Sequence, residues 1–168
     1  SYDPIKEVLV TVGGSEAIDI ALRAMINPGE EVLIPQPSYV SYEPCAILAD
    51  AKPVVIELKE ENEFRLTAQE LRDAITDKTK MLVIVSPSNP TGGVLSRVSL
   101  EAIAAIAKEH DLLVLSDEIY DRFVYDEQQE LVSIASLPGM KERSIVLNGF
   151  SKSMAMTGWR LGYIAAPE

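Results

Sequence analysis

The segment Gly149–Gly162 decides the expected fold, because it contains the whole connection between two apolar runs. Its sequence is GFSKSMAMTGWRLG, which contains Lys152 and, further along, Arg160. The run before it, Ser144–Asn148, and the run that it enters, Leu161–Ala165, both have the composition of buried strands. We therefore expect two neighbouring strands joined by a connection that carries a lysine among small apolar residues.

The residue types in this segment indicate a particular chemistry. Small apolar neighbours are poor surroundings for a surface ammonium, so the amine of Lys152 is a candidate for Schiff-base formation with a carbonyl compound. The guanidinium of Arg160 is a planar fork of donors that suits an anion. Together the two side chains suggest a carbonyl cofactor that carries a phosphate.

Short apolar runs alternate with helical patterns along the rest of the chain. The expected strands are Glu7–Val12, Glu31–Pro35, Lys52–Glu57, Met81–Ser86, Leu112–Ser116, Ser144–Asn148 and Leu161–Ala165. The expected helices are Ser15–Ile26, Tyr39–Ala49, Thr67–Thr76 and Ser96–His110. Several strands are apolar without polar alternation, which is typical of strands covered on both faces. The pattern predicts an α/β fold, a three-layer α/β/α arrangement with a mostly parallel seven-stranded sheet.

Composition narrows the class of protein. The chain has 168 residues, of which 47% are hydrophobic, and its net charge is -11. This acidic balance argues against nucleic acid or an anionic membrane as partner. Cys45 is the only cysteine, so we expect neither an internal disulfide nor a cysteine-based metal cluster, and a reducing cytoplasmic location is consistent. No apolar stretch approaches the ~20 residues that span a bilayer.

Chemically useful residues follow five of the expected strands. They are Gly13-Gly14-Ser15-Glu16, Tyr39, Asn89, Asp117 with Tyr120, and Lys152. Three of them have an ordinary structural explanation: a glycine turn, a packing tyrosine and a turn asparagine. In open α/β sheets, however, ligands bind beyond the carboxyl ends of the strands. Five such signals at one edge of a sheet therefore predict a binding site.

These residue types suit a phosphorylated pyridine aldehyde. A carboxylate such as Asp117 can keep a pyridine nitrogen protonated, which makes the ring an electron sink. Asparagine and tyrosine can hydrogen-bond a phenolic oxygen, and an aromatic face can stack on the ring. The free N–H groups at the start of the first helix favour a phosphate.

These motifs resemble those of a known family. The Gly149–Gly162 segment is similar to the cofactor-lysine signature of class I/II aminotransferases, the family of fold-type I pyridoxal-phosphate enzymes that includes aspartate aminotransferase. Ser86–Gly92 (SPSNPTG) and Asp117–Tyr120 (DEIY) resemble two other hallmark segments of the family. The resemblance covers essentially all 168 residues and implies the large, cofactor-binding domain.

The resemblance implies a role for each candidate residue around the ring. Lys152 would form the internal aldimine with pyridoxal 5'-phosphate and then carry the proton between the substrate α-carbon and the cofactor. Asp117 would pair with the pyridine nitrogen. Tyr120 and Asn89 would bond the phenolic oxygen. Tyr39 would stack on the ring, where many relatives have tryptophan.

At the phosphate, the resemblance implies binding by Gly14, Ser15 and Glu16 at the helix start, with Arg160 as the charged partner. Many relatives have a phosphate-binding serine three residues before the lysine, but here that residue is Gly149. One phosphate contact is therefore unassigned, and Ser151 is the nearest alternative hydroxyl.

The resemblance also implies segments that have no counterpart in these 168 residues. Full-length relatives are roughly twice as long, with a helical segment before the large domain and a small domain after it. The small domain carries the arginine that binds the substrate carboxylate, and relatives are homodimers. The expected activity is transamination between an amino acid and a 2-oxo acid, and we expect the 168-residue chain alone to bind cofactor weakly and to transaminate poorly or not at all.

Three alternatives remain open at this stage. A hydrolase would use Ser151, but the chain's one histidine, His110, precedes it and ends a helix far from the strand tips. A non-catalytic aminotransferase-like effector domain would require a DNA-binding region in a longer parent sequence. A lyase, decarboxylase or synthase could use the same lysine and cofactor residues.

Overall fold

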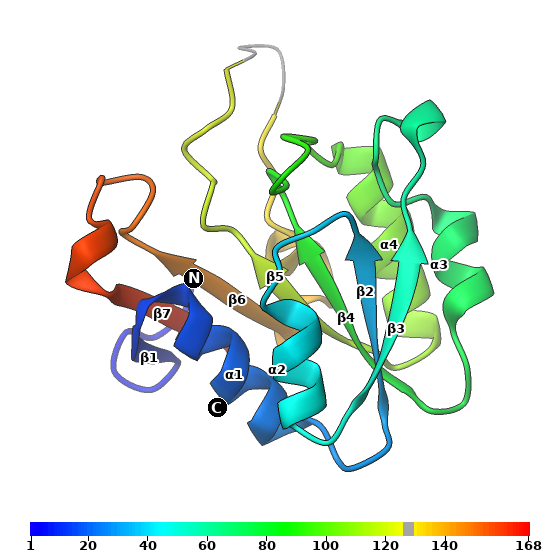
Figure 1. The fold of residues 1–168 in the computed structure, drawn as a ribbon, viewed down its shortest axis with the longest axis horizontal. Helices are drawn as coiled ribbons and strands as arrows, with labels where there is room; N and C mark the ends of the chain where they lie inside the picture. The colour runs from blue at the N-terminus through cyan, green and yellow to red at the C-terminus, as the bar shows by residue number, and fades with distance from the viewer. Residues whose placement is uncertain (126–129) are drawn as a thin grey trace.

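The computed structural model describes residues 1–125 and 130–168, and its centre is a seven-stranded sheet (Figure 1). The strand order is β1-β7-β6-β5-β4-β2-β3. The strands are β1 (Val8–Val12), β2 (Glu31–Gln36), β3 (Lys52–Glu57), β4 (Thr79–Val85), β5 (Leu113–Asp117), β6 (Ser144–Gly149) and β7 (Leu161–Ala165). All seven expected strands are present, with bounds within two residues of those predicted.

Strand β7 runs against its neighbours, whereas the other neighbouring pairs are parallel. It pairs antiparallel with β6 on one side and with β1 on the other. The connection from β6 is too short to contain a crossover helix, so the chain turns back beside β6. Because β1 pairs with β7 on its other side, the C-terminal ends of β1, β2, β4, β5 and β6 share one edge. We call it the carboxyl edge.

Four helices cover the two faces of the sheet (Figure 1). They are α1 (Gly13–Met25), α2 (Tyr42–Leu48), α3 (Ala68–Ala74) and α4 (Arg97–Glu109). Helices α1 and α2 pack on one face with residues such as Val32 and Met81, and α3 and α4 pack on the other with Leu33 and Leu82. Alternate residues of each central strand thus enter different cores. The predicted three-layer arrangement is confirmed.

Two helix starts differ from the prediction. Helix α1 begins at Gly13, two residues early, because the glycines predicted as a turn are the first helical residues themselves. Helix α2 begins at Tyr42 rather than Tyr39, with Pro44 in its first turn, where a missing N–H costs no helical bond. The residues before Tyr42 are consequently irregular chain at the carboxyl edge.

Helix α3 begins at Ala68, one residue after the predicted Thr67, which is its N-cap residue. The Thr67 hydroxyl accepts a bond from the Glu70 N–H, and the Glu70 carboxylate accepts one from the Thr67 N–H, which completes a capping box. Leu66 and Leu71 flank this cap, and both are buried in the core beneath α3 and α4.

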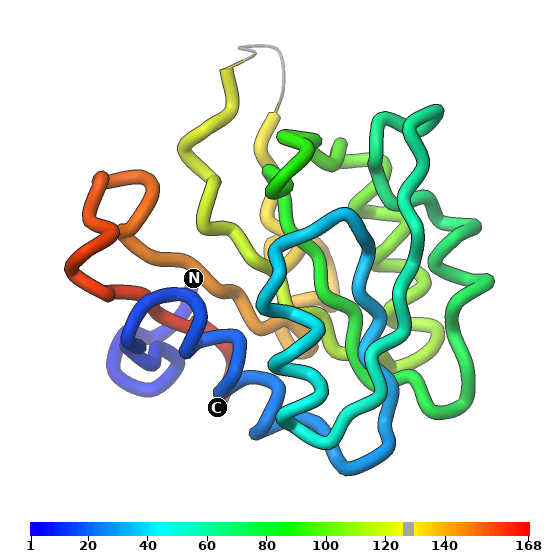
Figure 2. The backbone as a smooth tube through the Cα atoms, viewed as in Figure 1, coloured from blue at the N-terminus to red at the C-terminus, as the bar shows by residue number. Residues whose placement is uncertain are grey.

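The two ends of the chain lie near one another (Figure 2). The Ala166 N–H donates to the Glu7 carbonyl at 3.0 Å, and Lys6 pairs with Glu168 at 3.2 Å. Within the described residues, none of the helices is both long enough and apolar enough to cross a membrane.

A core substitution on β4 tests the packing of the layer under α3 and α4. Leu82 is fully buried there, so Leu82→Ala is expected to lower the free energy of unfolding by about 2–5 kcal/mol through lost contacts and a cavity. Val98 on α4 is 75% exposed, and Val98→Ala serves as the control, with a change of at most about 0.5 kcal/mol. Urea denaturation measures both, and equal effects would contradict the described packing.

Candidate functional site

A cavity of about 220 Å³ opens at the carboxyl edge of the sheet. Most of the predicted site residues line it, although they come from five separate stretches of the chain. These residues are Gly14, Ser15, Tyr39, Asn89, Asp117, Tyr120, Lys152 and Arg160, and Ser151 lies among them. Glu16 does not line the cavity, because its carboxylate turns back to accept a bond from the Val12 N–H at the start of α1.

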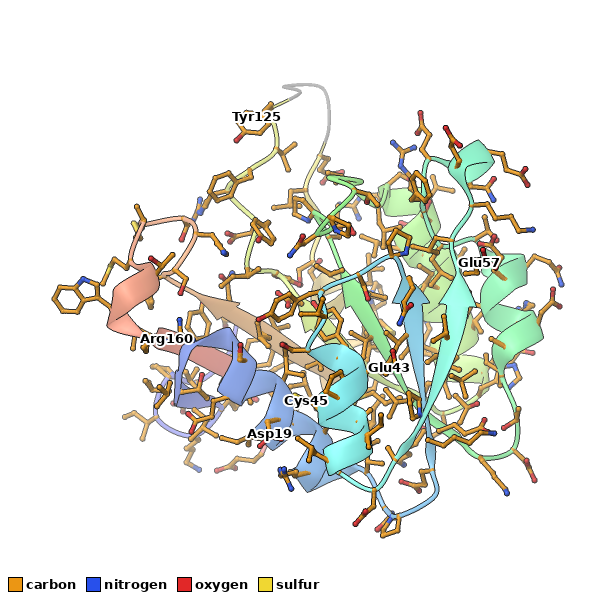
Figure 3. The ribbon with its side chains drawn as sticks, viewed as in Figure 1. Asp19, Glu43, Cys45, Glu57, Tyr125 and Arg160 are labelled. Atoms are coloured by element: carbon orange, nitrogen blue, oxygen red, sulfur yellow. The ribbon has the colours of Figure 1, made fainter. Side chains whose placement is uncertain are left out.

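One end of the cavity is formed by backbone that lacks side chains. Strand β7 begins so close to α1 that a Cβ on Gly162 would lie 2.6 Å from the carbonyl carbon of Gly13. Gly13 itself has a φ of +74°, which glycine adopts without strain. The guanidinium of Arg160 lies against Gly13, and Figure 3 shows this arginine beside the start of α1. The helix N-terminus and the guanidinium together present N–H donors and positive charge that would suit an anion.

Asp117 lies at the end of β5 with only 4% of its surface exposed. It accepts bonds from the Tyr42 hydroxyl at 2.7 Å and from the Ile119 N–H at 3.0 Å. Burial raises the pKa of this carboxyl, and the two hydrogen bonds oppose that rise. No lysine, arginine or histidine in residues 1–125 and 130–168 forms an ion pair with it. A buried carboxylate of this kind is suited to a cation supplied by a ligand.

Tyr39 contacts Ser15 at the start of α1 and Tyr42, which binds Asp117. Its hydroxyl lies 3.3 Å from the hydroxyl of Ser15, and this bond lowers the pKa of Tyr39. Its ring meets that of Tyr42 edge to face, with centroids 5.8 Å apart. Because Tyr39 belongs to the irregular chain before α2, these contacts fix an aromatic ring over the cavity.

Lys152 lies on the turn that follows β6, and its Nζ is 5.8 Å from the centroid of the Tyr120 ring. The apolar surroundings expected from the sequence are not found, because Lys152 and its neighbours Met154 and Ala155 are exposed. The turn extends past the end of the sheet instead of folding into a core. The amine therefore faces the cavity from its solvent-accessible side.

The glycine at position 149 has a packing explanation. A Cβ there would lie 2.9 Å from the carbonyl oxygen of Leu161 and 3.1 Å from the Cα of Gly162. Strands β6 and β7 thus approach too closely for a side chain at this position. Ser151, the residue before the lysine, lines the cavity.

The whole chain matches one family of known proteins. The model of the family described as aminotransferase class I and II matches residues 1–168. This chain belongs to the aminotransferase class I and II family.

Individual members of the family are similar over nearly the full chain. The aspartate aminotransferase of Pyrococcus abyssi is 57% identical over 166 residues, which is 99% of this chain and 42% of that protein. Aromatic-amino-acid aminotransferase 2 of Thermococcus litoralis is 54% identical over 166 residues, again 99% and 42%. The crystal structure of the aromatic aminotransferase from Pyrococcus horikoshii superposes with a TM-score of 0.97 at 54% identity, covering 99% of this chain and 44% of that one. The chain therefore spans less than half the length of these relatives.

The positions of Ser151 and His110 do not support a hydrolase triad. His110, the one histidine of the sequence, lies beside Gly29 and Asp77 at the opposite edge of the sheet from Ser151. Among the described residues, no group of three or more His, Cys, Asp or Glu side chains is placed to hold a metal ion.

Sequence reasoning missed one polar residue beside this cavity. Tyr42 was placed within a predicted helix, but its hydroxyl binds Asp117, a residue 75 positions away. The available signal was indirect: a buried carboxylate needs donors, and a tyrosine three residues after Tyr39 is a candidate. Apolar residues also line the cavity, among them Ile18, Val85 and Leu147.

The contact between β7 and α1 can be tested by adding one methyl group. Gly162→Ala is expected to destabilise the protein by about 1–3 kcal/mol, since the new Cβ would overlap the backbone at Gly13. Gly158 provides a matched control because a Cβ there meets nothing within 4 Å, so Gly158→Ala should change stability by less than about 0.5 kcal/mol. Urea denaturation distinguishes the two, and a neutral Gly162→Ala would refute the close approach.

The burial of Asp117 predicts a pH effect on the protein without added ligand. Because burial raises its pKa, the folded state keeps this proton to a higher pH than the unfolded state. The contribution of Asp117 to the free energy of unfolding therefore falls as pH rises from its pKa in the unfolded state to its pKa in the folded state. Asp117→Asn removes the titration, so we expect the stability of the variant relative to wild type to increase as pH rises above about 4, the ordinary pKa of an aspartate.

Urea denaturation of both proteins across this pH range checks the expectation. Other carboxyl groups, such as Glu7 and Glu31 with their lowered pKa values, titrate in both proteins and cancel in the difference. A difference that does not vary with pH would show that Asp117 is not buried as described.

Proposed function

We propose that this chain is the cofactor-binding part of a pyridoxal-phosphate-dependent aminotransferase. The observation that carries the proposal is the buried Asp117, which has no cationic partner in the described residues and lines the same cavity as Lys152. A protonated pyridine nitrogen, hydrogen-bonded to the Asp117 carboxylate, would supply the positive charge that this carboxylate lacks. The helix start and Arg160 at the other end of the cavity suit the phosphate of the same molecule.

The chemistry of the proposed reaction comes from the cofactor, which when bound supplies an aldehyde for amino groups and a ring that withdraws electrons. The residues of the chain position it and move protons. Lys152 Nζ would hold the cofactor through its aldehyde carbon, with the aldehyde oxygen leaving as water, and as a free amine would carry the proton between the substrate α-carbon and the cofactor. Asp117 would keep the ring nitrogen protonated.

The remaining cavity residues would hold and orient the cofactor. Tyr120 and Asn89 would hydrogen-bond the phenolic oxygen, and Tyr39 would cover one face of the ring. Gly14 and Ser15 would hold the phosphate through N–H and hydroxyl groups, with Arg160 adding a bidentate charge-assisted contact. Glu16 would act on the helix start rather than on the phosphate, because its side chain is engaged with Val12.

Substrates and partners belong to the same proposal. We infer an amino acid and a 2-oxo acid as substrates, in amino acid metabolism of a biosynthetic kind. We further infer a cytoplasmic homodimer in which this chain is the large domain. Two relatives with 57% and 54% identity are named for aspartate and for aromatic amino acids. Residues shared with both therefore do not choose the side chain of the substrate, and we infer that much of the selectivity lies outside residues 1–168.

The assignment of Lys152 has a direct test. Pyridoxal phosphate is titrated into the wild type and into Lys152→Ala, and the absorbance band of a lysine adduct is recorded. We expect the band in the wild type only, because the variant lacks the one amine that lines the cavity in the described residues. Borohydride reduction followed by peptide mass spectrometry should place the cofactor on Lys152.

The control is Lys59→Ala, which removes an exposed lysine outside the cavity. This variant should retain the band and the modified Lys152 peptide. A band that persists in Lys152→Ala, or that is absent from the wild type, would contradict the proposal.

A further inference from the structure

Tyr42 is the one residue that contacts both Asp117 and Tyr39 among the interactions of the described chain. It is the first residue of α2 and only 1% exposed. Its hydroxyl donates to Asp117 Oδ2 at 2.7 Å, and its ring meets the Tyr39 ring at an interplanar angle of 83°. One side chain thus links the acid at the end of β5 to the aromatic residue that covers the cavity.

The Asp117 carboxylate has an independent donor on each oxygen. The Ile119 N–H donates to Oδ1 at 3.0 Å, and the Tyr42 hydroxyl is the one side-chain donor to it within residues 1–125 and 130–168. Two donors on two oxygens fix both the position and the rotation of a carboxylate. Hydrogen bonds to the charged form also oppose the protonation that burial favours.

Other charged and titratable groups around Asp117 do not replace this bond. Tyr39, Tyr120 and Lys152 line the same cavity, as does Arg160, but none has a hydrogen bond or ion pair with the carboxylate. Glu118, the next residue, is directed to the hydroxyls of Ser116 and Ser133 instead. The ionisation of Asp117 therefore depends strongly on Tyr42.

We propose that Tyr42 is a positioning residue whose hydroxyl keeps the Asp117 carboxylate ionised and correctly rotated for the ring nitrogen of the cofactor. This inference rests on the proposed pyridoxal-phosphate function and extends it to a residue that does not itself touch the reacting atoms. Without the hydroxyl, a buried carboxyl group becomes easier to protonate and loses its attraction for a protonated ring.

The test compares two ligands in the full-length protein. One is pyridoxal phosphate, and the other is its 1-deaza analogue, which keeps the aldehyde and phosphate but has carbon in place of the ring nitrogen. Their dissociation constants are measured for the wild type, Tyr42→Phe and Asp117→Asn. We expect the wild type to prefer pyridoxal phosphate, and Tyr42→Phe to reduce this preference about tenfold, the effect of one hydrogen bond to a charged group.

A double-mutant cycle ties the effect to Asp117. Once Asp117→Asn has removed the charge, adding Tyr42→Phe should cause little further loss of preference. A second readout needs no cofactor: the ¹³C resonance of the Asp117 carboxyl, followed against pH, should titrate at a higher pH in Tyr42→Phe. Tyr2→Phe is the matched control, since it removes a buried hydroxyl that has no hydrogen-bond partner in the described chain and does not line the cavity.

The possible outcomes distinguish the role of Tyr42 from the proposed function of the chain. A reduced preference with an unchanged affinity for inorganic phosphate supports the inference and shows that the variant is folded. Equal weakening of both ligands, or an unchanged preference and an unchanged Asp117 titration, would overturn the role of Tyr42 while leaving the proposed function intact. A wild type that forms a lysine adduct with neither aldehyde would overturn the proposed function and this inference with it.

Discussion

The close backbone contact between the start of β7 and the start of α1 is the constraint on which the site depends. It exists because Gly162 and Gly13 have no side chains to separate the two segments. The antiparallel β7 lies between β6 and β1, so this contact brings the first strand–helix junction next to the end of β6. Residues from the beginning and the end of the chain consequently share one cavity. A parallel β7 would have required a crossover connection, and the chain would have entered the strand from the opposite edge of the sheet.

A second constraint acts against stability. The sheet buries Asp117 among apolar neighbours, and the structure offsets the cost with a tyrosine hydroxyl and one backbone N–H rather than with a cation. A carboxylate held in this way has a strong tendency to bind a positively charged partner. The burial of this carboxylate thus carries an electrostatic cost at a position that lines the cavity.

The sequence alone predicted much of this arrangement, because strand burial and helix caps are local properties. The limits of β3 and β7 agree with their predicted ranges, and the capping box of α3 follows from four consecutive residues. The start of α1 differs from the prediction because Gly13 and Gly14, expected as a turn, lie in its first turn and approach Gly162 of β7, a contact that no local pattern shows. The exposure of Lys152 and the bond from Tyr42 to Asp117 likewise depend on neighbours that are distant in sequence.

The position of Lys152 and Arg160 on one short connection has a consequence for ligand size. The connection is held at both ends, by β6 before the lysine and by β7 after the arginine. The two strands therefore limit how far apart the backbone positions of Lys152 and Arg160 can lie. A molecule held at both points must have its two functional groups at a matching separation.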